Sequence, residues 1–294
     1  MGLKTNKWTI AYRKKQGQLL DDLNGFIAIK ANYKGCYADP FLFDYQGETY
    51  LFAEYLNYRH GRGTIAYAKY DKVTNIFSDF KEIIFENYHL SYPLVFSFND
   101  EIYMMPEANE SNSLYIYKAI DFPDKWEKYA IVAENVRLVD TSPFWHDNEL
   151  FLLSKENETP QAPMLLLKVD TNNWGVVNKK VITDDVCISR PGGNAFLIDN
   201  RFYIPTQDCK DDYGAALNFL SFTVNSNLEF NYTVEKKVTP DMLSIPGIEK
   251  IVGIHTYNYS NDLEVIDFKY PVNSFSRLFW KLIRVTKQKL HLSK

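Results

Sequence analysis

The sequence predicts an all-β protein: a five-bladed β-propeller with a short C-terminal amphipathic helix. Aromatic residues make up 16% of the chain, with 21 Tyr and 20 Phe, and such rings pack well on pleated strands. A strand–turn–strand pattern recurs about every 50 residues, which is the length of one four-stranded propeller blade. A third observation, the apolar and basic pattern after residue 274, predicts the helix.

The first copy of the repeat occupies residues 38–54, with the sequence Ala-Asp-Pro-Phe-Leu-Phe-Asp-Tyr-Gln-Gly-Glu-Thr-Tyr-Leu-Phe-Ala-Glu. Apolar residues lead to a turn at residues 46–48, and a second aromatic run leads back to Glu54. This order of residues predicts a β-hairpin. Residues 64–70 then form the third strand of the same blade.

Three clear copies and one degenerate copy follow, at residues 91–107, 139–155, 189–208 and 254–267. The prolines that anchor the four clear copies are 53, 50 and 48 residues apart: Pro40, Pro93, Pro143 and Pro191. Residues 8–13 form a lone N-terminal strand, which we expect to complete the last blade. The alternative fold, a β-sandwich, would give short strands at even spacing but not the same turn at this period.

Residues 1–270 are therefore predicted to form the propeller and residues 271–294 a basic tail. After residue 270 the chain has six Lys or Arg and no Asp or Glu. The apolar residues of the tail follow a helical spacing: Phe275, Leu278, Phe279, Leu282 and Ile283. A basic amphipathic helix suits an anionic membrane surface, so we predict membrane contact through residues 275–290. The alternative is a helix that docks on the propeller or on a partner.

Charge and cysteine content limit the function classes. The net charge of −4 argues against nucleic-acid binding. The three cysteines, Cys36, Cys187 and Cys209, have no C-x-x-C spacing and favour a reducing compartment. The N-terminus lacks the apolar stretch of a secretory signal, and no run of 18 apolar residues is present. We therefore expect a cytoplasmic location, with the protein peripheral on the inner face of the membrane.

Motifs for several common chemistries are missing from the sequence. It has no H-E-x-x-H motif, no clustered Cys and His and no EF-hand loop, so we expect no metal site and no cofactor. It has no G-x-S-x-G motif, which argues against a nucleophile elbow. It also has no D-x-D triplet, which argues against the commonest metal-dependent sugar-nucleotide transferases.

Polar residues occur at corresponding positions of the repeats. In a blade, the start of the innermost strand and the end of the next strand lie at one mouth of the central channel. Five residues open the innermost strands: Asp39, Tyr92, Asp140, Arg190 and His255. Four residues end the returning strands: Glu54, Glu107, Lys155 and Asp208. We expect all nine to surround one funnel, because an unpaired charge is costly to bury elsewhere.

Each of these residues also has a purely structural interpretation. An Asp at the start of a strand often binds only the backbone of a turn, which applies to Asp39 and Asp140. Arg190 could form a salt bridge with Asp208 or Asp39, although Arg also holds carboxylates and phosphates in a bidentate fork. Glu107 could be a solvated loop carboxylate, and His255 a hydrogen-bonded core histidine.

Four segments in order resemble one known family. They are A-D-P-F-L-F with Y-L-F-A-E, S-Y-P with M-P-E, R-P-G-G-N with Q-D-C, and G-I-H-T-Y-N with D-L-E-V-I-D. The chain is similar over about residues 30–268 to the N-terminal domain family of plant glucosamine inositolphosphorylceramide transferase. The resemblance implies a role in cell-surface polysaccharide or glycolipid synthesis. It also implies the plan of the five-bladed propellers of family-43 glycoside hydrolases.

In those hydrolases, an Asp on blade one is the base, an Asp on blade three tunes acidity, and a Glu on blade four is the acid. By this resemblance Asp39 and Asp140 match the first two positions, whereas the fourth blade has Arg190 in place of Glu. The departure argues against simple hydrolysis, because the leaving oxygen then lacks an obvious acid. Glu107 is the candidate acid.

Three functions remain open. The first is glycosyl transfer from a sugar, sugar nucleotide or lipid-linked sugar. In this reaction Asp39 acts as the base, and Asp140 positions Asp39 or tunes its acidity. Arg190 and His255 stabilise an anionic leaving group or a donor phosphate. Glu54, Tyr92 and Asp208 are predicted to bind substrate. The second function is glycoside hydrolysis with Asp39 and Glu107, and the third is glycan binding without catalysis.

Overall fold

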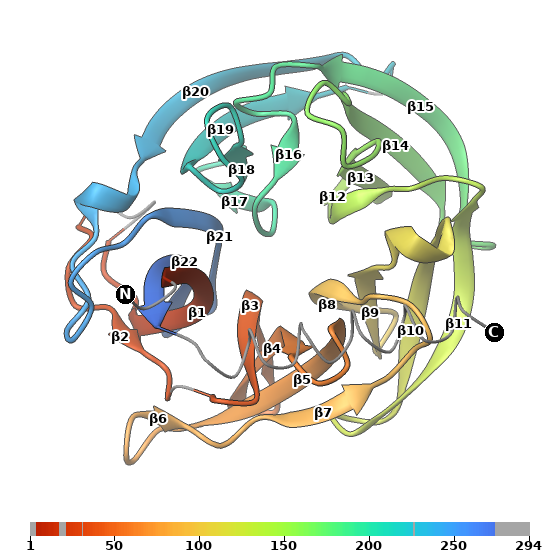
Figure 1. Cartoon of the computed structure of the whole chain (residues 1–294). Coiled ribbons are helices and arrows are strands. Elements are labelled where there is room, and N and C mark those ends of the chain that lie inside the picture. The colour runs from red at the N-terminus through yellow and green to blue at the C-terminus, as the bar shows by residue number, and fades with distance from the viewer. Residues whose placement is uncertain (1–3, 18–21, 31, 226, 274–294) are drawn as a thin grey trace, which may run out of the picture.

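A computed structural model describes the chain except residues 1–3, 18–21, 31, 226 and 274–294. The described residues form five antiparallel sheets arranged around a common centre (Figure 1). In each sheet the strands lie side by side from the centre of the ring to its rim. The predicted five-bladed, all-β propeller is therefore confirmed.

Each blade contains four or five strands. Blade one consists of β3 (Gly35–Tyr45), β4 (Glu48–Asn57), β5 (Arg62–Asp71), β6 (Ile76–Phe77) and β7 (Lys81–Ile84). Blade two consists of β8 (Ser91–Phe98), β9 (Glu101–Glu107), β10 (Ser113–Asp121) and β11 (Lys125–Glu134). Blade three consists of β12 (Val139–His146), β13 (Glu149–Lys155), β14 (Met164–Asp170) and β15 (Gly175–Thr183). Blade four consists of β16 (Arg190–Pro191), β17 (Phe196–Ile198), β18 (Arg201–Asp208), β19 (Ala216–Val224) and β20 (Phe230–Val238).

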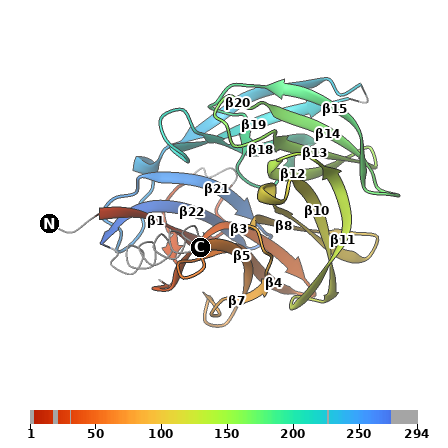
Figure 2. The same cartoon turned by 45° about the vertical axis from the view of Figure 1, so that its right-hand side comes forward.

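Blade five joins the two ends of the described chain. It consists of β21 (Gly253–Tyr259), β22 (Leu263–Asn273), β1 (Lys4–Lys14) and β2 (Ile27–Ala28). Strand β1 pairs with β22 over its full length, from Lys4 opposite Asn273 to Lys14 opposite Leu263. Figure 2 shows β22 between β1 and β21. The N-terminal strand thus completes the last blade, as predicted.

The predicted C-terminal helix has no support in the structure. Its residues lie outside the described part of the chain, except 271–273, which continue strand β22. The helices among the described residues are two short 3₁₀ turns, η1 (Asn109–Ser111) and η2 (Pro240–Met242). None of the described helices is long and apolar enough to span a membrane.

The hairpin turns between the first two strands of four blades share one conformation. Both central residues have positive φ in each of them: Gln46 and Gly47 (50° and 79°), Asn99 and Asp100 (49° and 62°), Asp147 and Asn148 (50° and 62°), Asp199 and Asn200 (48° and 61°). Positive φ at both positions defines the type I′ turn, which favours Asn, Asp and Gly and fits the twist of the flanking strands. The Asn, Asp and Gly residues of these turns therefore fix how each inner strand pairs with the strand that follows it.

A β-bulge interrupts the innermost strand of several blades at the same level. Asp39, Tyr92 and Asp140 have φ of 50°, 48° and 50°, and the strand register shifts at each of them. Pro40 and Pro93 follow two of the bulges and cannot donate to the ladder, because proline has no N–H. Bulges re-aim side chains and leave backbone groups unpaired. Here they turn polar residues towards the axis of the ring.

The hydrophobic cores lie between neighbouring blades. Phe96 of blade two packs against Trp145 and Trp174 of blade three, with ring centroids 5.4 and 6.4 Å apart. Phe52 of blade one similarly packs against Trp126 of blade two at 6.0 Å. Many of the aromatic residues therefore hold blades together rather than line a cleft, in accord with their high β-propensity.

Candidate functional site

A cluster of polar side chains lies at the axis of the ring, where the innermost strands begin. We call it the axial cluster, and its members are Asp39, Glu107, Asp140, Arg190, Gln207, His255 and Asp267. All except Arg190 are buried, and the Arg190 side chain is 14% exposed. They come from all five blades, so only the closed ring brings them together.

One half of the axial cluster is a histidine between two carboxylates. His255 Nε2 lies 3.0 Å from Asp39 Oδ1, and Nδ1 lies 2.8 Å from Asp267 Oδ1. Burial alone would lower the pKa of His255, but Asp267 and Asp39 together raise that pKa to about 10. His255 is therefore a cationic imidazolium at neutral pH, and it compensates the charge of the two carboxylates.

The same carboxylates bind backbone groups that the bulges leave unpaired. Asp39 Oδ2 accepts the N–H of Tyr92 at 3.1 Å, and Asp267 Oδ2 accepts the N–H of Asp39 at 2.9 Å. The Thr256 hydroxyl donates to Asp39 Oδ1 at 3.2 Å. Both oxygens of Asp39 are thus held in place, which fixes the position of this carboxylate and keeps it desolvated.

The other half of the cluster is centred on Asp140. Arg190 Nε donates to Asp140 Oδ2 at 2.5 Å, and Gln207 Nε2 donates to the same oxygen at 2.6 Å. The guanidinium carbon of Arg190 lies 4.8 Å from the centroid of the Tyr213 ring. This stacking adds a cation–π contact and orients the guanidinium group. Asp140 is therefore an ion-paired carboxylate in a rigid setting.

Glu107 links the second blade to this half. Its Oε2 accepts the N–H of Asp140 at 3.0 Å, and its Oε1 accepts a hydrogen bond from Asn109 Nδ2 at 3.0 Å. Burial raises the pKa of Glu107 well above its usual value, the charge of Asp140 adds to this effect, and Arg190 partly offsets it. Glu107 thus favours the protonated form, as an acid would, but both of its oxygens already have partners.

Two aromatic residues at the rim of the cluster had no signal in the sequence. The ring of Trp8 lies 4.0 Å from that of His255, and the ring of Tyr213 lies 5.0 Å from it. Lys269 Nζ contacts Asp212 Oδ2 at 2.5 Å and donates to the Tyr213 carbonyl at 3.0 Å, which holds the loop that carries Tyr213. The rim is therefore part aromatic and part charged, a combination that suits sugars.

Three of the predicted funnel residues point elsewhere. Tyr92 is fully buried, and its hydroxyl contacts Ser142 Oγ at 2.8 Å and the Gly193 carbonyl at 3.0 Å. Lys155 Nζ donates to the Ala162 carbonyl at 2.7 Å, to the Pro160 carbonyl at 3.2 Å and to Ser189 Oγ at 3.0 Å. Asp208 Oδ2 pairs with Lys237 of β20 at 2.7 Å. The structure does not bring these three side chains to the axial cluster.

The pairing of strands explains why Gln207, and not Asp208, reaches the cluster. The first strand positions Ala38, Ser91 and Val139 lie opposite Glu54, Glu107 and Lys155. In blade four it is Arg190 itself, the equivalent of Asp39, Tyr92 and Asp140, that lies opposite a residue of the second strand, and this residue is Gln207. Because successive side chains of a strand point to opposite faces, the neighbouring Asp208 faces away from the axis.

Asp39, His255 and Asp267 also have the composition of a metal site. Their candidate ligand atoms lie within 4.8 Å of one another. Both ring nitrogens of His255 also lie at ion-pair distance from a carboxylate, so the same three side chains can equally form a charge-compensated ion-pair group.

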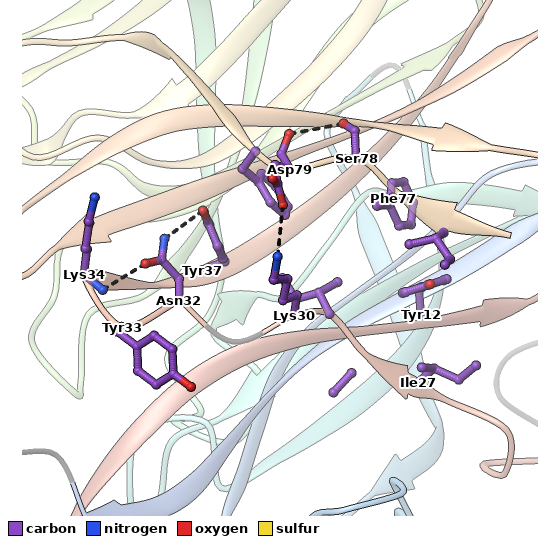
Figure 3. A pocket seen from close by; sticks show the side chains of 14 residues that line it. Tyr12, Ile27, Lys30, Asn32, Tyr33, Lys34, Tyr37, Phe77, Ser78 and Asp79 are labelled. Atoms are coloured by element: carbon purple, nitrogen blue, oxygen red, sulfur yellow. Dashed lines mark hydrogen bonds and ion pairs between the residues drawn. The ribbon is translucent and has the colours of Figure 1, made fainter. Parts of the chain in front are cut away.

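A pocket of about 860 Å³ lies away from the axial cluster. It is a groove between the outer strands of blades five and one, with Tyr12 and Tyr37 among its lining residues (Figure 3). Lys30 Nζ and Asp79 Oδ1 approach to 3.9 Å in this groove, and both side chains are highly exposed. None of its lining residues belongs to the axial cluster, so we treat it as separate from the candidate site.

Several solved structures with a similar fold are glycoside hydrolases. The chain covers 98% of the catalytic domain of the GH62 α-L-arabinofuranosidase of Coprinopsis cinerea, over 91% of its own length, with a TM-score of 0.62 and 14% identity. It covers 86% of the GH43_1 enzyme of Xanthomonas citri, solved with xylotriose, over 80% of its own length, with a TM-score of 0.56 and 9% identity. At these identities the similarity is one of fold.

Sequence comparison identifies closer relatives. The chain is 32% identical over 202 residues to glucosamine inositolphosphorylceramide transferase 1 of Arabidopsis thaliana, which covers 66% of this chain and 26% of that protein. It is 28% identical over 225 residues to the protein of the same name in Oryza sativa subsp. indica, covering 72% of this chain and 28% of that protein. The chain thus spans roughly a quarter of the length of these relatives. Residues 27–242 match the family model described as glucosamine inositolphosphorylceramide transferase 1, N-terminal, and the chain belongs to this family.

Proposed function

We propose that this protein transfers a glycosyl group at the axial cluster, in the synthesis of a cell-surface polysaccharide or glycolipid. The observation that carries the proposal is the pair of aspartates on blades one and three, each held by its own cation. His255 lies 3.0 Å from Asp39, and Arg190 lies 2.5 Å from Asp140. The transferase name of the relatives and the glycoside hydrolase folds of the structural neighbours support a carbohydrate substrate.

In the proposed reaction, the hydroxyl of the acceptor attacks the anomeric carbon of the donor sugar and gives its proton to Asp39. The bond from the anomeric carbon to the leaving oxygen breaks at the same time. Asp140 holds Arg190 towards the leaving group, where Arg190 and His255 stabilise developing negative charge. Fixed, desolvated charges suit this purpose, because they need no rearrangement during the reaction.

Glycoside hydrolysis is the second candidate, and one observation favours it. The structural neighbours that share the ring are hydrolases, and in hydrolysis water takes the place of the acceptor hydroxyl. The same base would serve both reactions. The two candidates therefore differ in the acceptor and not in the position of Asp39.

The substitution Asp39→Asn tests the proposal. It removes the proton acceptor with almost no change in shape, so we expect transfer to fall at least about 100-fold. The assay measures sugar release and sugar transfer from nucleotide sugars and lipid-linked sugars to glycolipid acceptors, and sugar release from polysaccharides. The matched control is Asp44→Asn, an exposed aspartate near the far end of the same strand.

Retention of full activity by Asp39→Asn would exclude this residue as the base. Release of free sugar without transfer to any acceptor would favour hydrolysis instead. Binding of sugars by a protein that neither transfers nor hydrolyses them would identify a glycan-binding module.

A further inference from the structure

A second pair of ionisable side chains lies at the junction of blades one and two, beside the axial cluster. Glu54 lies in strand β4 opposite Ala38 of β3, and His89 lies in the connection that enters blade two. His89 Nε2 is 3.3 Å from Glu54 Oε1. The Glu54 side chain is 13% exposed and that of His89 is 30% exposed, so both reach solvent.

The backbone fixes which nitrogen of His89 carries the proton. The N–H of Gly63 donates to His89 Nδ1 at 3.0 Å, so Nδ1 is an acceptor and the proton of the neutral ring lies on Nε2. Glu110 Oε2 accepts the N–H of His89 at 2.8 Å and fixes the loop from the other side. A Cβ on Gly63 would lie 2.4 Å from the Leu90 carbonyl, so this approach requires glycine.

Glu54 differs from Glu107 in how its oxygens are used. Its Oε1 pairs with His89, whereas both oxygens of Glu107 accept hydrogen bonds from neighbouring residues. Burial raises the pKa of Glu54, His89 opposes this rise, and the charge of Asp39 adds to it. With Oε1 facing the N–H of His89, a proton on Glu54 lies on Oε2.

Charged groups surround this pair from several elements. Asp39 and His255 of the axial cluster act on Glu54, and Glu110 and Asp39 act on His89. Strand pairing places Glu54 opposite Ala38, the residue before Asp39, so Glu54 lies beside the proposed base. An anomeric carbon between Glu54 and Asp39 would have its leaving oxygen on the side of the acid and the attacking hydroxyl on the side of the base, which is the arrangement that direct glycosyl transfer and hydrolysis require.

We propose that Glu54 is the proton donor of the reaction and that His89 positions it. This inference rests on the proposed function and supplies the acid that the fourth blade lacks. As the anomeric C–O bond breaks, the proton of Glu54 Oε2 moves to the leaving oxygen. The carboxylate that remains is stabilised by the Nε2–H of His89. The acceptor proton goes to Asp39. After the product leaves, Asp39 releases this proton to solvent and Glu54 regains one from solvent.

The leaving group of the substrate provides the test. Methyl glycosides of a panel of hexoses need an acid, because methoxide is a poor leaving group. In the 4-nitrophenyl glycosides of the same hexoses, 4-nitrophenolate leaves without protonation. We expect Glu54→Gln to lower turnover of the methyl glycosides about 100-fold and to change that of the 4-nitrophenyl glycosides far less. Glu86→Gln is the matched control, since Glu86 lies in the same connection but binds Lys128 at 2.8 Å. Should Glu54→Gln fail to fold, Glu54→Ala, which also lacks the acid, carries the same expectation.

The role of His89 has its own readout. The basic limb of the pH–rate profile reports the pKa of the acid. His89→Ala removes the donor that stabilises the carboxylate, so we expect this limb to move upward by up to about one pH unit. His89→Gln retains an N–H donor and should leave the limb near its original position. An unmoved limb in His89→Ala would overturn the positioning role.

The outcomes separate this inference from the proposed function. Suppose that Asp39→Asn abolishes activity, but Glu54→Gln has no effect or affects both classes of glycoside equally. This result would exclude Glu54 as the donor and leave the proposed glycosyl transfer intact. A wild-type protein without activity on any donor would overturn both.

Discussion

At the axis, single carboxylates both stabilise the fold and prepare the site. Asp39 and Asp267 accept N–H groups that the bulges leave unpaired, and they also flank His255. Removing such a carboxylate outright would leave buried donors without partners, at about 1–3 kcal/mol each. Isosteric amides are therefore the informative substitutions here, because they retain one acceptor oxygen while removing the charge.

The raised pKa of His255 predicts how stability depends on pH. In the unfolded chain this histidine titrates near its ordinary pKa of about 6.5, but in the fold its pKa is about 10. The ion pairs therefore contribute fully below pH 6.5, and their contribution is lost as the pH rises towards 10. We expect the free energy of unfolding, measured with urea, to fall over this window.

The comparison variant for this titration is His255→Gln, which cannot become cationic. Its free energy of unfolding should lack the part of the pH dependence that the histidine supplies. Identical slopes for the two proteins between pH 6.5 and 10 would contradict the presence of an imidazolium between Asp39 and Asp267.

The residues that converge at the axis could be predicted only in part. Asp39, Asp140, Arg190 and His255 were predicted from their position at the start of repeats, and the structure brings them together. Asp208 was predicted to face the axis, but its neighbour Gln207 does so instead. A sequence repeat gives the level of a residue along a strand but not the face to which its side chain points. Trp8 and Tyr213 could not be predicted, since they lie outside the repeated segments.

At the scale of elements, one residue of the second strand in each of three blades lies beside the bulge and contacts the next blade or the connection that enters it. Glu54 contacts His89, Glu107 accepts the N–H of Asp140, and Lys155 donates to Ser189. These contacts join neighbouring blades at the mouth, whereas the aromatic cores join them elsewhere. The polar repeat seen in the sequence therefore has an architectural basis as well as a chemical one.

The type I′ turns make a specific prediction about Gly47. Its φ is 79°, and a Cβ placed on it would meet no atom within 4 Å. The cost of Gly47→Ala is therefore conformational and not steric, and we expect destabilisation of about 1 kcal/mol. Thermal unfolding followed by circular dichroism measures it, and the midpoint should fall by about 2 °C.

Gly175→Ala is the control for this turn. Gly175 lies outside the left-handed region, and its Cβ would approach only the flexible side chain of Asn173, so alanine should cost less there. Equal losses at the two positions would show that the hairpin turn does not depend on positive φ.

At the scale of the whole molecule, the ring depends on its first strand. β1 supplies eleven residue pairs to β22, and Ile10 and Ala11 in its middle are fully buried. The period of the repeats predicted this closure. It gives five units, the last of which lacks one strand, and one N-terminal strand that can complete it. The exact partners could not be predicted: contacts such as that between Asp39 and Asp267 join residues 228 positions apart.

Deletion of residues 1–14 should therefore prevent cooperative folding. It removes one strand of blade five and exposes the edge of β22, and exposed edges promote aggregation. Size-exclusion chromatography and urea unfolding measure the effect, and a peptide of residues 4–14 added in trans should restore part of the monomer. Deletion of residues 1–3 alone is the control. A monomeric, cooperatively unfolding protein after the longer deletion would contradict closure by β1.

The buried Tyr92 limits the kind of carbohydrate that the proposed reaction can use. Its side chain extends from blade two, and its hydroxyl bonds to Ser142 of blade three and to Gly193 of blade four. Blade five adds Asn258, which donates to the Pro40 carbonyl of blade one at 2.6 Å. These bonds bridge the innermost strands across the ring. If the axial cluster acts on a carbohydrate, as we propose, a polysaccharide cannot pass through the ring, and a chain end or branch has to enter and leave on the same side.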